Sequence, residues 1–261
     1  MGKMGALFVS DTHLRKGKDE NYKKFMEFLS LVIRGQLPGG IEGGITDVFF
    51  LGDIFDFWFA RRLQVYAEFR PVLERMAELQ EKGIRIHLFE GNHDFFLKDY
   101  FEEWANIFIY EDWGELVLDG YRFIMAHGDL IDHENRRYLF LRKILRTRAF
   151  YLFQRSLPLA WVWFLAGFSS DLGKEKRQLG EERLVEKMRE FARKCFARGY
   201  EVAVFGHCHL PRIYVENYEG RPRVFVVLGD WLNYFTFLYY RNGILSLRDI
   251  TGKNIGTGHL G

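Results

Sequence analysis

Histidine, aspartate and asparagine residues gather in five short polar clusters along this chain of 261 residues. Imidazole, carboxylate and amide groups bind divalent metal ions and move protons, so the clusters are candidates for metal-assisted hydrolysis. Asp11 and His13 are two residues apart, as are His207 and His209, so the side chains of each pair project to the same side of an extended segment. The clusters contain Asp11 and His13; Asp53 and Asp56; Asn92, His93 and Asp94; His127 and Asp129; and His207 and His209.

Seven of these side chains are typical metal ligands, which is too many for one tetrahedral ion. Two divalent ions that share one carboxylate would use all seven. Asp53 is the natural bridge, because a carboxylate has two oxygens and offsets the repulsion between neighbouring cations. Nitrogen and oxygen donors without a thiolate fit Mn²⁺, Fe²⁺ or Zn²⁺, and Mn²⁺ is the ion we expect. The seven candidate ligands are Asp11, His13, Asp53, Asn92, His127, His207 and His209.

Short apolar runs rich in Val, Ile and Phe position these clusters, because five such runs end in one of them. Continuous apolar runs are typical of strands buried on both faces. The runs, including a sixth near the C-terminus, cover residues 6–13, 47–56, 84–94, 121–129, 201–209 and 223–231. Helical patterns alternate with them at 21–33, 67–83 and 180–199. This order predicts an α/β layered fold in which the strand ends converge on one rim of a sheet.

The rest of the chain predicts a hairpin, a loose tail and an insertion. Asn242-Gly243 inside residues 235–250 is typical of a type I′ hairpin turn. The glycine-rich residues 251–261 are expected to be loose. Residues 134–180 change from basic to apolar to polar and are interpreted as a helical insertion. We expect one domain over residues 1–261, since no linker or internal repeat interrupts it.

Net charge, cysteine count and the lengths of apolar runs argue against several classes of protein. The formal net charge of +2 gives no signature of nucleic-acid binding, and no protein partner is evident. Two cysteines argue against a disulfide framework and fit a reducing compartment. The N-terminus lacks the pattern of a signal peptide, and no apolar run approaches the roughly 18 residues of a membrane span. We therefore expect a cytoplasmic protein.

The motifs DTH, GDIFD, GNHD, HGD and GHCH, in this order, resemble the calcineurin-like metallophosphoesterase superfamily. The resemblance implies a four-layer α/β/β/α sandwich. It also implies one ion held by Asp11, His13, Asp53 and His209, and a second held by Asp53, Asn92, His127 and His207. His93 would protonate the leaving group or stabilise the transferring phosphoryl group. Asp56, Asp94 and Asp129 either orient ligand imidazoles or cap turns.

Longer stretches are similar to the UDP-2,3-diacylglucosamine hydrolases of lipid A synthesis: GDIFDFW, GNHDFFL, GHCHLPRI and VLGDW. The resemblance implies hydrolysis of the pyrophosphate of UDP-2,3-diacylglucosamine to UMP and 2,3-diacylglucosamine 1-phosphate. The chain departs from that family at three places. His93 stands where many members have Arg, FARR at 59–62 replaces a GDD motif, and GHCHLP replaces GHTHRP.

The insertion suits a cap over an amphiphilic substrate. Residues 134–155 carry seven basic residues and one acidic residue, and the apolar segment 157–168 follows. With the resemblance, arginines would face phosphates or an anionic membrane and apolar side chains would shelter acyl chains. The alternative is an ordinary helical hairpin with a solvated basic face. Candidate substrate contacts are Asn135, Tyr138, Arg142, Lys174 and Arg177.

Three functions follow in order of preference. The first is a hydrolase of this nucleotide-sugar lipid, peripheral at the cytoplasmic face of the inner membrane. The second is a metallophosphoesterase acting on another phosphoester, such as a cyclic nucleotide or a phosphoprotein. The third is a non-catalytic scaffold, which the presence of all seven candidate ligands disfavours.

Overall fold

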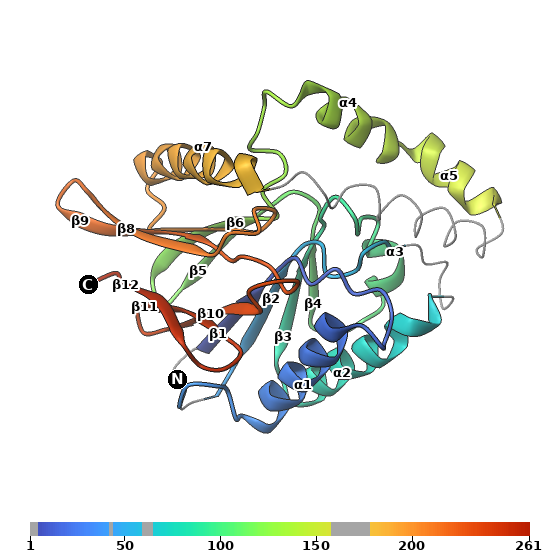
Figure 1. Cartoon of the computed structure of the whole chain (residues 1–261), viewed down its shortest axis with the longest axis horizontal. Helices are drawn as coiled ribbons and strands as arrows, with labels where there is room; N and C mark the ends of the chain where they lie inside the picture. The colour runs from blue at the N-terminus through green and yellow to red at the C-terminus, as the bar shows by residue number, and fades with distance from the viewer. Residues whose placement is uncertain (1–4, 42–43, 59–64, 158–177) are drawn as a thin grey trace.

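The computed structural model describes residues 5–41, 44–58, 65–157 and 178–261. Two β-sheets face each other at its centre, with helices on their outer faces (Figure 1). Lys174, Arg177 and residues 158–168 of the apolar segment lie outside the described residues. The α/β/β/α sandwich expected from the resemblance is confirmed.

The first sheet has seven strands in the order β12-β11-β10-β1-β2-β3-β4. Strands β1, β2, β3 and β4 run parallel, and β10, β11 and β12 add antiparallel strands beside β1. Their bounds are β1 Gly5–Val9, β2 Asp47–Leu51, β3 Arg85–Phe89, β4 Ile107–Tyr110, β10 Thr236–Arg241, β11 Ile244–Asp249 and β12 Asn254–His259.

The second sheet has five strands in the order β5-β6-β7-β9-β8. Strands β6, β7 and β9 are parallel, while β5 and β8 form antiparallel edges. Their bounds are β5 Trp113–Leu118, β6 Tyr121–Ala126, β7 Val202–Phe205, β8 Arg212–Tyr218 and β9 Arg221–Val227.

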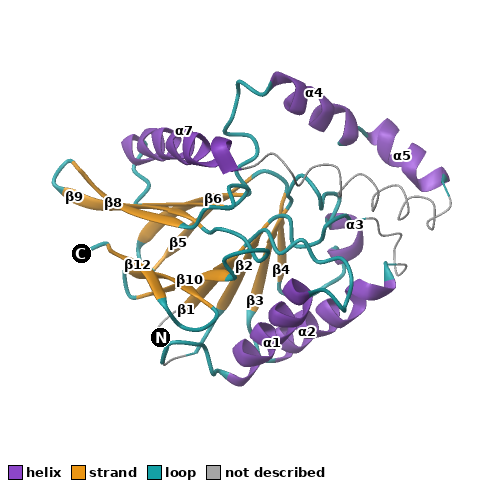
Figure 2. Cartoon of the chain, in the orientation of Figure 1, coloured by secondary structure: helices purple, strands orange, loops and turns teal. Residues whose placement is uncertain are grey.

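Helices cover the outer face of each sheet (Figure 2). Helices α1 (Glu20–Arg34) and α2 (Arg70–Glu81, after the short helix η1, Ala67–Phe69) lie against the first sheet, and α7 (Gln178–Ala197) lies against the second. The short helix α3 spans Lys98–Phe101. The three helical patterns of the sequence correspond to α1, η1 with α2, and α7, so these predictions are confirmed.

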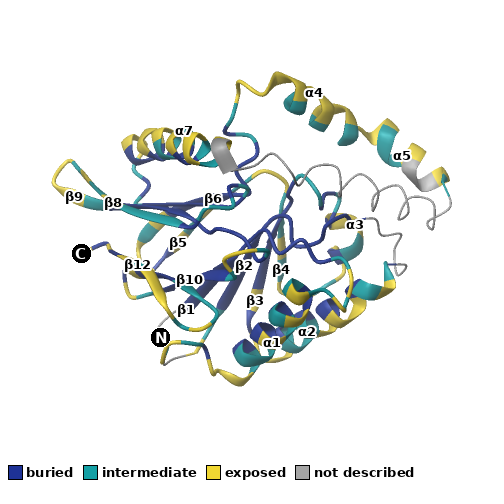
Figure 3. Cartoon of the chain, viewed as in Figure 1, coloured by how far each residue is buried: buried dark blue, intermediate teal, exposed yellow. Residues whose placement is uncertain are grey.

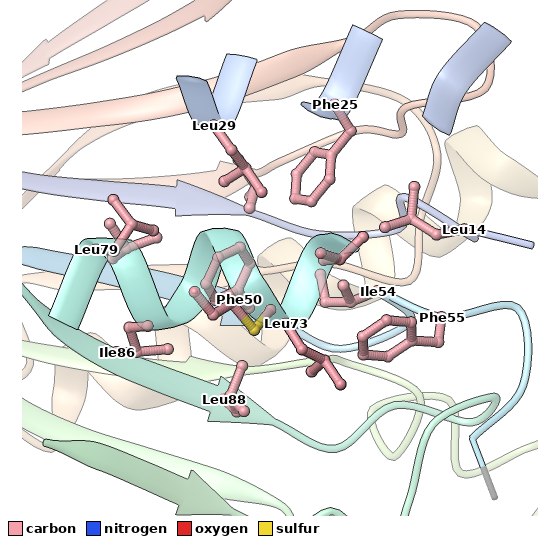
Figure 4. Close-up of a cluster of buried hydrophobic side chains, with 14 of the residues drawn as sticks. Leu14, Phe25, Leu29, Phe50, Ile54, Phe55, Leu73, Leu79, Ile86 and Leu88 are labelled. Carbon is pink, nitrogen blue, oxygen red and sulfur yellow. The ribbon is translucent and has the colours of Figure 1, made fainter. Parts of the chain in front are cut away.

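Three apolar clusters hold the layers together. One lies between the two sheets, where Phe8 stacks on Phe49 at a centroid distance of 4.5 Å. A second fills the space between the first sheet and its helices, where Phe50 and Ile86 face Leu73 and Leu79 of α2 (Figure 4). The third lies beneath α7. Because strands of both sheets are covered on both faces, they form the continuous apolar runs seen in the sequence.

The predicted hairpin is present, whereas the prediction of a loose tail is wrong. Asn242 and Gly243 both have positive φ, as a type I′ turn requires, and they join β10 to β11. The tail forms β12, which pairs with β11. A Cβ at Gly256 would lie 2.3 Å from the side chain of Ile213. Here glycine permits close packing of a strand on the second sheet rather than flexibility.

Two helices of the insertion, α4 (Arg136–Leu145) and α5 (Arg148–Ser156), lie outside both sheets (Figure 1). None of the α4 side chains is buried, and both helices show mostly exposed surface (Figure 3). Among the described helices, which exclude residues 158–177, none combines the length and the apolar character needed to cross a bilayer.

Candidate metal centre

The five polar clusters meet in loops that follow five strands, β1, β2, β3, β6 and β7. The first three strands belong to the seven-stranded sheet and the other two to the five-stranded sheet. The sequence predicted a single rim, but the structure divides the clusters between two sheets whose carboxyl ends meet. Each sheet therefore supplies part of the site.

Asp53 lies at the centre of the site. Its Oδ2 is 3.8 Å from Nε2 of His13, 4.0 Å from Nε2 of His93 and 3.5 Å from Nε2 of His127. Burial alone would raise the pKa of Asp53, but the imidazoles of His127, His93 and His13 outweigh burial and lower it below its usual range. Asp53 therefore stays ionised at neutral pH, with one oxygen shared among three rings.

Asn92, His127 and His207 form one group of donor atoms beside Asp53. Nε2 of His127 is 3.0 Å from Oδ1 of Asn92 and 3.2 Å from Nδ1 of His207. Nδ1 of His127 lies 3.0 Å from the carbonyl oxygen of Leu51 and therefore carries the hydrogen in the neutral ring. The lone pair of Nε2 then faces the lone pairs of Asn92 Oδ1 and His207 Nδ1. These lone pairs repel one another unless a positive charge lies between them.

The pKa of His127 also indicates that a positive charge is favoured at this position. Burial disfavours a charged ring, yet the carboxylates of Asp53, Asp11 and Asp129 raise its pKa to about 9. Burial and the neighbouring His127 lower the pKa of His207 to about 4, so its ring is neutral and has a lone pair to offer. This donor set fits a divalent ion, which would take the place of the proton.

Asp11, His13 and His209 form the second group. One donor atom from each lies within 4.8 Å of the other two. Among the described residues, the buried Oδ1 of Asp11 and Nε2 of His13 have no hydrogen-bond partner. Buried polar atoms without partners are rare in folded proteins and are explained at such sites by an ion. This group also fits a divalent ion.

Asp56 supports two rings of the site. Its Oδ1 lies 3.5 Å from Nδ1 of His13, and its backbone carbonyl oxygen lies 3.0 Å from Nδ1 of His93. Both rings therefore turn Nε2 toward Asp53. Asp56 thus orients one ring through its side chain and another through its main chain.

Asp94 and Asp129 contact other partners. The carboxylate of Asp94 accepts hydrogen bonds from four backbone N–H groups, those of Asp53, Ile54, Phe55 and Gly91. It therefore shapes the loop that carries Asp53. Asp129 accepts hydrogen bonds from the Tyr138 hydroxyl and, at 2.7 Å, from Nε of Arg142.

Backbone strain is concentrated at the site. Asp11, His13, Asp53 and His207 have φ values between 44° and 63°, in the left-handed region that residues other than glycine rarely adopt. Each such residue costs about 1–3 kcal/mol and persists only where its surroundings enforce it. This backbone conformation directs the four side chains toward the candidate metal site.

A cavity of about 520 Å³ opens above the donor groups. The side chain of His93 is 25 % exposed there, whereas that of His127 is 1 % exposed. Of the described candidate substrate contacts, Asn135 lines the cavity, while Tyr138 and Arg142 lie beside Asp129 instead. The cavity is also lined by five charged residues that were not among the predicted site residues: Asp132, Glu134, Glu181, Arg183 and Lys187.

Asp230 is a site residue that sequence reasoning missed. Its Oδ2 lies 2.8 Å from Nδ1 of His209, and it is fully buried. The signal was present, because Asp230 ends the sixth apolar run just as the other site carboxylates end theirs.

Comparison with known proteins agrees with this geometry. The model of the calcineurin-like phosphoesterase family matches residues 4–211. UDP-2,3-diacylglucosamine hydrolase of Neisseria meningitidis serogroup C is 31 % identical over 229 residues, which are 87 % of this chain and 90 % of that protein. The protein of the same name from Pseudomonas entomophila is 26 % identical over 226 residues, 86 % of this chain and 90 % of that protein.

A solved structure of vacuolar protein sorting 29 from Cryptosporidium parvum overlays on this chain with a TM-score of 0.48 and 12 % identity, covering 99 % of this chain and 97 % of that one. A likeness of this size supports no conclusion about function. The match to the family model over residues 4–211 is sufficient: this chain belongs to the calcineurin-like phosphoesterase family.

Proposed function

We propose that this chain hydrolyses the pyrophosphate of UDP-2,3-diacylglucosamine to UMP and 2,3-diacylglucosamine 1-phosphate. Water adds to one phosphorus, the bond from that phosphorus to the bridging oxygen breaks, and the departing phosphate receives a proton. The observation that carries the proposal is the position of Asp53 within 4.0 Å of three imidazole nitrogens, in a chain whose curated relatives bear that enzyme's name.

Two divalent ions, Mn²⁺ by preference, would occupy the two donor groups and share Asp53. Asp11, His13 and His209 would complete one set of ligands, and Asn92, His127 and His207 the other. When bound, such ions make water a better nucleophile near neutral pH and neutralise phosphoryl oxygens. The protein holds the donors in place through Asp56, Asp94 and Asp230.

His93 is proposed to supply the proton. Its Nδ1 faces the carbonyl oxygen of Asp56, which fixes the hydrogen on that atom. Its Nε2 points toward Asp53 and the cavity. In the doubly protonated ring Nε2 also carries a hydrogen, which can pass to the oxygen of the departing phosphate and leave the neutral ring, or donate a hydrogen bond to the transferring group.

The insertion is proposed to recognise the substrate and the membrane that holds it. Asn135, Tyr138, Arg142, Lys174 and Arg177 remain the predicted substrate contacts. The exposed helices α4 and α5 carry both basic and large apolar side chains, including Phe140 at 67 % exposure. These properties favour peripheral contact with an anionic surface at the cytoplasmic face of the inner membrane.

The test is hydrolysis of UDP-2,3-diacylglucosamine by purified protein with Mn²⁺, followed as release of UMP. Reaction in ¹⁸O-labelled water identifies the attacked phosphorus from the product that carries the label. A soluble phosphodiester is assayed in parallel. Turnover of the lipid substrate with little turnover of the soluble one is expected. Faster hydrolysis of the soluble compound by orders of magnitude would instead favour another phosphoester.

A further inference from the structure

Arg146, at the end of α4, is bound to the loop that carries Asn92 and His93. Its guanidinium donates to Oε2 of Glu90 at 2.7 Å and to the carbonyl oxygen of Gly91 at 2.8 Å, with a longer contact of 3.3 Å to the carbonyl oxygen of Glu111. The arginine side chain is 14 % exposed and that of Glu90 is 4 % exposed. Removing one partner of a buried ion pair leaves the other partner buried without compensation, so loss of Arg146 should disturb this loop.

The Gly91 carbonyl belongs to the same peptide group as the backbone nitrogen of Asn92. A hydrogen bond to that carbonyl therefore restrains the orientation of the peptide from which Asn92 projects. The other end of the loop is closed by Glu90, whose Oε1 accepts the N–H of Leu97 at 2.9 Å. A Cβ at Gly91 would lie 2.2 Å from Oδ1 of Asp53. The loop therefore packs directly against the carboxylate of Asp53, and a side chain at position 91 would not fit.

One face of α4 makes all of these attachments. Tyr138, Arg142 and Arg146 are four residues apart, so they lie on the same side of the helix. Tyr138 and Arg142 contact Asp129, two residues after His127, and Arg146 contacts the residues just before Asn92. The same helix is thereby fastened to the two loops that carry Asn92 and His127.

We propose that Arg146 is a positioning residue: by holding helix α4 against this loop, it fixes the geometry of the metal site formed by Asn92, His127 and His207. This inference rests on the proposed function, which assigns that group as ligands. Without Arg146 the Gly91–Asn92 peptide can rotate and Asn92 loses its fixed approach to His127. The other group, Asp11, His13 and His209, comes from other loops. It is linked to this loop by the rings of His13 and His93, whose centroids are 4.9 Å apart, and by Asp53, which accepts the N–H of His93 at 2.9 Å. These links do not involve Arg146, so the ion held by this group should bind nearly normally.

The test is titration of metal-free protein with Mn²⁺, comparing wild type, Arg146→Ala and the control Lys143→Ala. Lys143 is an exposed cation on the same helix, so the control matches the loss of charge. Wild type and the control should bind two ions per chain. Arg146→Ala should bind one ion normally and the other about 10- to 100-fold more weakly, as for other residues that orient metal ligands. Raising the Mn²⁺ concentration should restore much of its turnover.

Arg146→Lys provides a second variant in case the alanine variant folds poorly. It keeps the charge but loses the two-pronged hydrogen bonding, and it should show intermediate weakening of the same single ion. Thermal unfolding of the metal-free variants reports any general loss of stability. A variant that is less stable but binds both ions with wild-type affinity, or loses both equally, would overturn the coupling. Failure of wild type itself to bind two ions would instead overturn the proposed function and, with it, this inference.

Discussion

The carboxylate of Asp230 lies 2.8 Å from Nδ1 of His209 and holds that ring from the side away from the cavity. Its other oxygen accepts the backbone N–H groups of Asn233 and Tyr234 at 2.8 and 3.1 Å. Burial would raise the pKa of Asp230, but the hydrogen bond from His209 and these N–H groups lower it. An ionised Asp230 therefore fixes the hydrogen on Nδ1 and leaves Nε2 of His209 available to a metal ion.

Asp230→Asn should weaken the ion at Asp11, His13 and His209 by about 10- to 100-fold, because the imidazole loses its charged partner. Mn²⁺ titration of the metal-free variant measures this directly. Asn233→Ala is the control, since it removes only the side-chain hydrogen bond to Oδ2 and should change the affinity much less. Unaltered binding of both ions in Asp230→Asn would show that His209 needs no such support.

Asp53 and His93 should separate metal binding from proton transfer. Asp53→Ala removes the carboxylate between the two donor groups, so it should abolish turnover and weaken both ions. His93→Ala should lower kcat by about 10²- to 10⁴-fold, the usual contribution of a general acid, while the metal content stays at the wild-type level. Metal analysis of the purified proteins, together with kcat at saturating substrate, distinguishes the two. Equal metal loss in both variants would contradict these roles.

The sequence predicted most of the strands and helices and the polar clusters, because these depend on local patterns. Strands buried on both faces appear in the sequence as continuous apolar runs. A polar cluster after each run marks where the strand ends. Asp11 and His13 follow β1, and His207 and His209 follow β7. The family motifs added the layer order, which periodicity does not contain.

What the sequence missed depends on contacts between distant segments. Asp230 reaches His209 across 21 residues, and Arg146 reaches Glu90 across 56. Neither partner is specified by spacing, so an aspartate or arginine at these places looks like any other polar residue. The prediction for the glycines of β12 failed for the same reason, since their close neighbours, Ile213 for Gly256 and Val224 for Gly258, belong to the other sheet.

Asp47, at the opposite end of β2 from Asp53, should contribute stability that depends on pH. It is 1 % exposed and accepts hydrogen bonds from Arg85, from Thr46 and from Nε2 of His87 at 3.0 Å. Burial would raise its pKa, but His87, Arg85 and Thr46 outweigh burial and lower it. A folded-state pKa below the unfolded one gives stability that is complete above the unfolded value, about 4, and is lost as the pH falls through the folded value.

Asp47→Asn should therefore lower the free energy of unfolding by about 1–2 kcal/mol at pH 7, allowing for the exposure of Arg85. Urea unfolding of both proteins from pH 7 down to the acid transition measures the difference, which should be constant above about pH 5 and shrink below pH 4. Arg85→Gln is the matched variant. Because the Arg85 side chain is 45 % exposed, this substitution should lower the free energy of unfolding by less than Asp47→Asn does. A difference that grew as the pH fell would contradict the assigned direction.

The outer face of α4 should bind anionic vesicles. Arg136, Phe140 and Ile144 are spaced by four residues on the side opposite Arg142, and Phe140 and Ile144 are 67 % and 42 % exposed. Cosedimentation should show more protein on vesicles containing phosphatidylglycerol than on phosphatidylcholine alone, and less binding as salt rises. Phe140→Ser should reduce the partition coefficient by about 10- to 150-fold, because burying this ring contributes about 1.5–3 kcal/mol.

Val215→Ser is the control for that experiment, because Val215 is also a large exposed apolar residue, at 52 %, but lies on β8. It removes an exposed apolar side chain from a surface that carries no part of the insertion, so its binding to vesicles should match wild type. Both variants are expected to hydrolyse a water-soluble, short-chain substrate at the wild-type rate, because neither residue lines the cavity. If both serine variants lost vesicle binding equally, the interaction would be a general property of exposed apolar side chains, and α4 would not be the surface that meets the membrane.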